Sequence, residues 1–154
     1  RMSKAAELAK FIADGTRSTH PAFLVSATSG QTNLSDDTTI AFTEIFDQGG
    51  NFASNTFTAP VTGRYQLNLQ MYTNEVDYDG AFAQFKLITS NRNYLTVIDP
   101  EAFDSNPTYW SFSLAALADM DASDTATVQL DIGSGHGNTI DISTFSYFSG
   151  FLVA

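Results

Sequence analysis

Two histidines have the widest chemical range of any residues in this chain, because imidazole can act as a base, a nucleophile or a metal ligand near neutral pH. His136 lies in the glycine-rich segment Gly133 to Asn138, and His20 lies in a polar segment just before Pro21. Catalysis by either would require an orienting partner and a nucleophile. The sequence has no G-x-S-x-G elbow, no H-E-x-x-H motif and no Walker motif. We therefore interpret His136 as a loop residue and predict that the chain is not an enzyme.

Pairs of carboxylates in expected turns are the candidates for metal binding. Asp77 and Asp79 flank Tyr78, and Asp121 and Asp124 lie in a second acidic turn. Ca²⁺ takes about six to eight oxygen ligands, which such turns can supply. Aspartate is also an ordinary turn residue, and the spacing of an EF-hand is absent. For these pairs, and for the neighbouring Asp36 and Asp37, the sequence leaves two alternatives open: Ca²⁺ binding or a set of solvated turns.

Exposed aromatic side chains would give a binding protein a platform on which sugars can stack. Four residues are candidates for this role: Tyr78, Tyr94, Tyr109 and Trp110. Trp110 alternates with apolar residues along its segment, so we predict that it lies in the core. Tyr78 lies between two aspartates at the tip of a loop, which favours an exposed contact. The predicted receptor contact is therefore Asp77, Tyr78 and Asp79, with a protein or a glycan as partner.

The elements that position these residues are predicted to be β-strands. The clearest is Arg64 to Thr73, where apolar residues alternate with polar ones from Tyr65 to Met71. A period of two is typical of a half-buried strand. Similar short segments, about ten in all, follow one another between turn signals. The pattern predicts an all-β sandwich or jelly roll over residues 21–154.

The last expected strand, Thr144 to Val153, has apolar residues on both faces. Tyr147 and Phe151 lie on one face, and Phe148 lies on the other. A sheet in a two-layer sandwich has a single inner face, so burial on both faces requires a second cover. We predict that a neighbouring subunit supplies it. The core and subunit-interface residues predicted in this domain are Tyr65, Tyr147, Phe148 and Phe151.

Residues 1–20 are expected to form a short α-helix and a linker. The helix would run from Ser3 to Asp14, with Ser3 as N-cap and Gly15 as the C-terminal glycine. Leu8 and Ile12 belong to a narrow apolar stripe on it. A helix of this length is marginal alone. The stripe therefore needs a partner, either its own domain or copies of itself in a parallel bundle, and we favour the bundle.

Composition excludes two classes of partner. The formal net charge is -10, with 7 Lys and Arg residues in the whole chain, which does not suit a phosphate-binding surface. No apolar run approaches the roughly 20 residues that span a bilayer. We therefore predict neither nucleic-acid binding nor membrane insertion. The absence of cysteine excludes disulfides and thiolate metal sites.

Two segments carry a resemblance to the C1q/TNF-like domain family. Phe57 to Gly63 (FTAPVTG), with Tyr65 after it, is similar to the family's Phe-Thr-Cys-Pro-Val-Pro-Gly-x-Tyr. Ser146 to Leu152 (SYFSGFL) resembles the closing Ser-x-Phe-Ser-Gly-Phe-Leu. Upstream, Asp47 and Phe52 match the family's pairing of Asn or Asp with an aromatic residue. The resemblance implies a ten-stranded jelly roll, a compact homotrimer and no enzymatic activity.

This chain also departs from the family pattern. Ala59 replaces the motif's cysteine, the spacing between Phe52 and Phe57 is short, and there is no collagen-like Gly-X-Y stalk. Met2 to Gly15 resembles the opening of phage tail-fibre and other virion appendage proteins. The combined resemblance implies an extracellular virion protein whose N-terminal helix contacts other virion proteins.

Three functions fit this combined resemblance. The first is a homotrimeric structural and attachment module at a fibre or appendage tip, which binds a host-surface protein or glycan. The second is a virion decoration protein with a purely structural role. The third is a secreted bacterial C1q-like adhesion domain. A glycan-cleaving enzyme would need a carboxylate pair in a groove, and the sequence identifies none.

Overall fold

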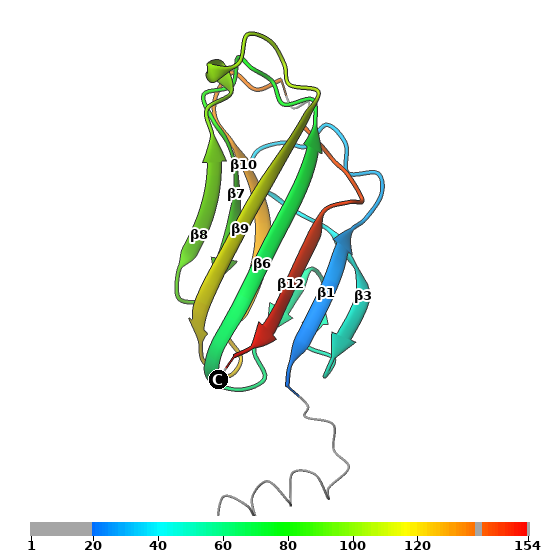
Figure 1. Cartoon of the computed structure of the whole chain (residues 1–154), viewed down its shortest axis with the longest axis vertical. Helices are drawn as coiled ribbons and strands as arrows, with labels where there is room; N and C mark the ends of the chain where they lie inside the picture. Colours follow the sequence, from blue (N-terminus) through cyan, green and yellow to red (C-terminus); the bar gives the residue numbers. More distant parts are fainter. Residues whose placement is uncertain (1–19, 138–139, 154) are drawn as a thin grey trace, which may run out of the picture.

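The alternating segments of the sequence form twelve β-strands in the computed structural model, which describes residues 20–137 and 140–153 (Figure 1). They make two six-stranded antiparallel sheets, here called sheet A and sheet B. Sheet A contains β1 (Ala22–Ala27), β3 (Phe42–Gln48), β6 (Gly63–Asn74), β9 (Tyr109–Met120), β11 (Asp141–Ile142) and β12 (Tyr147–Leu152). Sheet B contains β2 (Thr38–Thr39), β4 (Phe52–Ala53), β5 (Thr56–Thr58), β7 (Ala83–Thr89), β8 (Asn93–Ile98) and β10 (Thr125–Ile132).

Sheet A runs in the order β3, β1, β12, β6, β9, and β11 also pairs with β6 (Figure 1). β6 pairs with β9 along its whole length, from Gly63 opposite Met120 to Asn74 opposite Tyr109. The edges of this sheet are therefore β9 on one side and β3 on the other. We call the end of the sandwich near Gly63 the base and the end near Asn74 the apex.

The core lies between the two sheets and is rich in phenylalanine. The Phe23 ring stacks on Phe57 at a centroid distance of 4.6 Å and on Phe52 at 5.3 Å, and its edge meets Phe148 at 4.9 Å. Tyr65 is fully buried, and its hydroxyl donates a 2.8 Å hydrogen bond to the Val61 carbonyl. This cluster joins both motifs of the family resemblance, so these motifs encode packing.

The predicted all-β jelly roll is confirmed, with more and shorter strands than the ten expected. The expected N-terminal helix, with Leu8 and Ile12, lies outside the described residues. Within the described part, the one helical element is a 3₁₀ turn at Pro100–Ala102. No described helix has the length and apolar character needed to cross a membrane.

The two-faced pattern of the last strand has a clear structural counterpart. Phe148 is completely buried between the sheets, whereas Phe151 points away from the core and is 47% exposed. Edge strand β3 is even less covered, because its side chains from Thr43 to Phe46 are all exposed. The outer face of sheet A thus carries apolar side chains that no residue within 20–137 or 140–153 covers.

Candidate functional site

The outer face of sheet A is the candidate functional surface, and cross-strand register orders its side chains in rows. Nearest the base, Phe151 pairs with Gln66, which pairs with Leu117. In the next row towards the apex, Phe46 pairs with Leu24 at the edge of the sheet. Phe46, Phe151 and Leu117 are 48%, 47% and 55% exposed. We call these three residues the basal apolar band.

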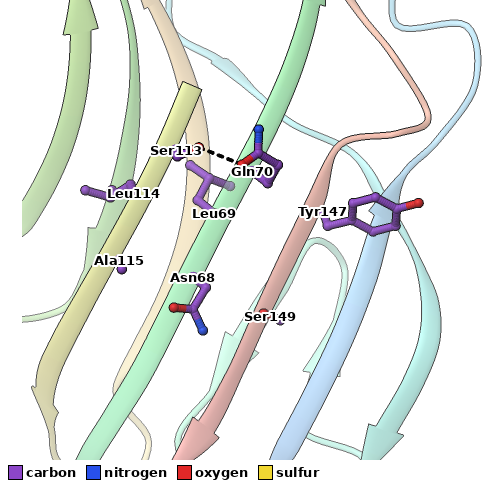
Figure 2. A pocket seen from close by; sticks show the side chains of 8 residues that line it. All are labelled: Asn68, Leu69, Gln70, Ser113, Leu114, Ala115, Tyr147 and Ser149. Atoms are coloured by element: carbon purple, nitrogen blue, oxygen red, sulfur yellow. Dashed lines mark hydrogen bonds between the residues drawn. The ribbon is translucent and has the colours of Figure 1, made fainter. Parts of the chain in front are cut away.

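A groove of about 350 Å³ opens on this face between β9, β6 and β12 (Figure 2). Two hydrogen bonds engage its polar groups: the Ser113 hydroxyl donates to Gln70 Oε1 at 2.6 Å, and Nε2 of the neighbouring Gln66 donates to Asn68 Oδ1 at 3.1 Å. Figure 2 shows Tyr147 reaching from β12 towards β1. The residues that line the groove are Asn68, Leu69, Gln70, Ser113, Leu114, Ala115, Tyr147 and Ser149.

The chemistry of this groove is that of a binding surface. Its lining has no carboxylate, imidazole, ammonium or guanidinium group. Amides and hydroxyls of this kind do not transfer protons near neutral pH, so the groove offers no general acid or base. Ala115 and the Tyr147 ring offer apolar surface on the outer face, whereas Leu69 and Leu114 pack against the core. The arrangement can bind a ligand or another chain through shape and apolar contact.

The predicted receptor contact lies at the apex, in the loop between β6 and β7. Tyr78 and Asp79 are exposed, whereas Asp77 is half-buried. The Asp77 carboxylate accepts hydrogen bonds from the Asp79 amide at 3.2 Å and from the Gly137 amide at 2.9 Å. The Tyr78 amide donates to Asn106 Oδ1 at 3.0 Å. Asp77 therefore holds apical loops together, and Tyr78 and Asp79 present their side chains to solvent.

Among the other aromatic candidates, Tyr109 is exposed and stacks on Tyr72 with ring centroids 5.8 Å apart. Trp110 is partly buried against the core, as its alternation predicted, and meets the edge of Phe103 at 5.0 Å. Tyr94 is also partly buried against the core. The four aromatic candidates therefore do not form one platform.

His136 lies in the apical loop after β10, as expected for a loop residue. Both ring nitrogens are buried and have no hydrogen-bond partner among the described residues. The ring packs against Gly80, where an added Cβ would lie 2.2 Å from Nε2. Burial lowers the pKa of His136, although the Asp77 carboxylate and the Phe82 backbone act in the opposite direction. The neutral ring thus fills space between two loops.

The four aspartates proposed as calcium ligands do not form one site. Asp77 and Asp79 follow the apical end of β6, whereas Asp121 and Asp124 lie next to its basal end, because Met120 pairs with Gly63. A strand of 12 residues separates the two pairs, a span of roughly 35 Å. At the base, Asp124 Oδ2 accepts from the Asp121 amide at 2.8 Å. Antiparallel register places the two turns at opposite ends of the sheet, so each pair would have to bind Ca²⁺ separately.

The third carboxylate pair of the sequence, Asp36 and Asp37, gains Asp131 as a neighbour on the outer face of sheet B. Carboxylate oxygens of Asp36, Asp37 and Asp131 lie within 4.8 Å of one another. The Lys86 ammonium pairs with Asp131 and lies 3.8 Å from Asp37, and Gln84 also donates to Asp131. A protein cation therefore occupies the position that a metal would take. Cross-strand register added Asp131 and Lys86 to the pair, and spacing along the chain gave no sign of these two.

The charges in this cluster shift one another's ionisation. The hydrogen bond to Asp131 raises the pKa of Lys86, against the effect of burial. Burial alone would raise the pKa of Asp131, but hydrogen bonds from Lys86 and Gln84 outweigh it and hold that pKa below its usual range. The cluster ties the loop before β2 to β7 and β10, which is a structural role.

Comparison with known proteins agrees with this geometry. The family model of the C1q domain matches residues 22–153. The globular domain of zebrafish complement 1qA protein is 18% identical, with a TM-score of 0.66 over 88% of this chain and 98% of that one. Murine APRIL at pH 8.5 is 13% identical, with a TM-score of 0.64 over 87% of this chain and 99% of that one. No curated protein matches. At these identities the structural likeness shows a shared fold.

Proposed function

This chain belongs to the C1q domain family, and from that premise we propose that it is a non-enzymatic homotrimeric module whose apex attaches a larger assembly to a receptor. C1q domains are often trimeric modules in binding or structural proteins, and the wider C1q/TNF group is generally non-enzymatic. The observation that carries the proposal is the uncovered outer face of sheet A.

The charge distribution on that face supports an association surface. The rows from Gln66 to Tyr72 across β6, β9, β12 and β1 present only apolar, amide and hydroxyl side chains. The formal net charge of the chain is -10. A neutral face with exposed Phe and Leu in such an acidic chain favours contact with another copy, because like charges would otherwise repel.

The oligomeric state tests this part of the proposal. We expect light scattering of the purified protein to give three times the chain mass of 16.7 kDa. A monomer at all accessible concentrations would contradict it.

The second part of the proposal concerns attachment. Tyr78 and Asp79 are exposed at the apex, and loops at one end of a rigid sandwich are a common place for recognition. Residues 2–15 resemble openings of virion appendage proteins, which supports a location on a virion surface. We accordingly propose that the trimer docks to other virion proteins through residues 1–20 and binds a host-surface protein or glycan through its apex.

Binding of fluorescently labelled trimer to host cells tests the attachment role. We expect Tyr78→Ala with Asp79→Asn to reduce binding at least about tenfold, as expected for loss of a central aromatic contact. Leu95→Ser, an exposed change on sheet B, is the matched control. Wild-type trimers that ignore host cells would favour the decoration role. Binding that survives the apical double change would place the receptor contact elsewhere.

A further inference from the structure

We propose that Phe46 on β3 of one subunit inserts into the groove between β9, β6 and β12 of the next subunit. This inference rests on the proposed homotrimer and names the contact that closes it. The groove is thus an incomplete site in the single chain, and a second copy supplies its occupant.

Edge strand β3 has the geometry of an inserted element. It pairs with β1 on one side and forms the edge of sheet A on the other. The register with β1 shifts between Leu24 and Val25, which leaves Ile45 as an extra residue beside Phe46. Both side chains are about half exposed, at 52% and 48%. Two adjacent exposed apolar side chains on an edge strand favour contact with another chain. The chain itself offers them no further cover among its described residues.

The position of Phe46 along the strands matches the position of the groove. Phe46 pairs with Leu24, Leu24 with Ser149, Ser149 with Asn68, and Asn68 with Ala115. Ser149, Asn68 and Ala115 all line the groove. A rotation about an axis parallel to the strands does not change the position of a residue along that axis. In a ring with such an axis, the groove of one subunit therefore meets side chains of the neighbour from the same row.

The two surfaces also agree in chemistry and in shape. The groove has a volume of about 350 Å³ and carries no charged group. Its rim amides and hydroxyls bond to one another, as in the 2.6 Å bond from Ser113 to Gln70. A phenyl ring can therefore cover Ala115 and the Tyr147 ring while the bond from Ser113 to Gln70 stays intact. Phe46 is the apolar residue of β3 that points to the outer face of sheet A.

The topology allows such a contact to close into a ring. β3 forms one edge of sheet A, and the groove lies towards the opposite edge, between β9 and β12 (Figures 1 and 2). Each subunit can therefore give Phe46 on one side and receive it on the other. A head-to-tail contact of this kind is heterologous and closes when the rotation does.

Thiol cross-linking tests this pairing without interference, because the chain has no cysteine. The variant carries Phe46→Cys and Ala115→Cys and is treated with a short bismaleimide. Linkage between neighbours converts the trimer into a ladder that ends at three times the chain mass on a denaturing gel. Each single variant lacks one partner thiol and should stay predominantly uncrosslinked. The matched control pair is Phe145→Cys with Ala115→Cys, because Phe145 is 70% exposed but lies in the apical loop between β11 and β12.

The outcomes separate the pairing from the trimer itself. Light scattering comes first, and a monomer would overturn both proposals. A trimer that gives no ladder with Phe46→Cys and Ala115→Cys, or the same ladder with the control pair, would overturn the pairing alone. As a second measurement, Phe46→Ala should raise the concentration of half-dissociation by at least about 100-fold. Trp110 fluorescence should stay native in that variant, and an unchanged midpoint would overturn the proposal.

Discussion

Truncation of Phe151 tests how much the basal apolar band contributes to the proposed trimer. A phenylalanine side chain buries roughly 200 Å² in full, and Phe151 is 47% exposed in the single chain. About 100 Å² per subunit remains to be covered, which is worth roughly 2.5 kcal/mol at about 25 cal/mol per Å². Loss of all three copies weakens the trimer by about 7 kcal/mol, which raises the overall dissociation constant by a factor of about 10⁵. That constant scales with concentration squared, so Phe151→Ala should raise the half-dissociation concentration roughly 300-fold.

Sedimentation velocity over a dilution series measures this midpoint directly. Phe148→Ala is the matched control, because Phe148 lies on the same strand but is fully buried among Phe23, Phe42 and Phe52. That change should lower the free energy of unfolding by about 3–5 kcal/mol at any protein concentration. Phe151→Ala should instead lower stability in a concentration-dependent way. An unchanged dissociation midpoint for Phe151→Ala would refute the assignment of the basal band to the interface.

Three further predictions concern the fold. Lys86→Met leaves Asp131 buried without its cation and should lower the free energy of unfolding, measured with urea, by about 3 kcal/mol. Adding Asp131→Asn should restore part of that stability. A further loss in the double variant would contradict the role of the ion pair. Burial lowers the pKa of His136 in the folded protein. As the pH falls, the unfolded chain therefore binds a proton at this residue before the folded protein does. The free energy of unfolding should decrease as the pH falls below about 6.5, the usual pKa of histidine. A flat difference between the unfolding energies of wild type and His136→Leu from pH 8 to pH 5 would disprove this. Gly150→Ala places a Cβ 2.6 Å from Leu67 Cδ2 and should lower the Tm measured by calorimetry by a few degrees. An unchanged Tm would contradict this prediction, because it would mean that Leu67 moves aside without cost.

The fold could be predicted from sequence because its signal is local. Alternation from Tyr65 to Met71 placed the inward face of β6 correctly, and all four apolar residues of that run are buried. The predicted core and interface set divides between two environments. Tyr65 and Phe148 lie in the core, whereas Tyr147 and Phe151 lie on the outer face of sheet A. Periodicity separated the two faces of the last strand but could not say which one met the second sheet.

The candidate sites were harder to predict because register decides them. The groove combines residues of β6, β9 and β12, whose sequence positions are far apart. The same is true of Asp131, which meets Asp36 and Asp37 through the pairing of β10 with β2 and β7. Register placed the other two candidate pairs at opposite ends of the sheet, and it brought Asp131 and Lys86 to Asp36 and Asp37, which spacing could not indicate. Side-chain type gave the candidates, and strand pairing determined which of them met.

The separation between base and apex is compatible with both parts of the proposed function, trimer formation and attachment. The basal band and the groove use apolar and neutral polar side chains, whereas the loop at the apex presents Tyr78 and Asp79. β6 and β9 run unbroken between these regions for 12 residues each, so the sheet holds them at a fixed distance. Apical residues can therefore change without altering the subunit contact. Three apices on one trimer would also convert a weak contact per subunit into firm attachment, because the second and third contacts form within the same complex.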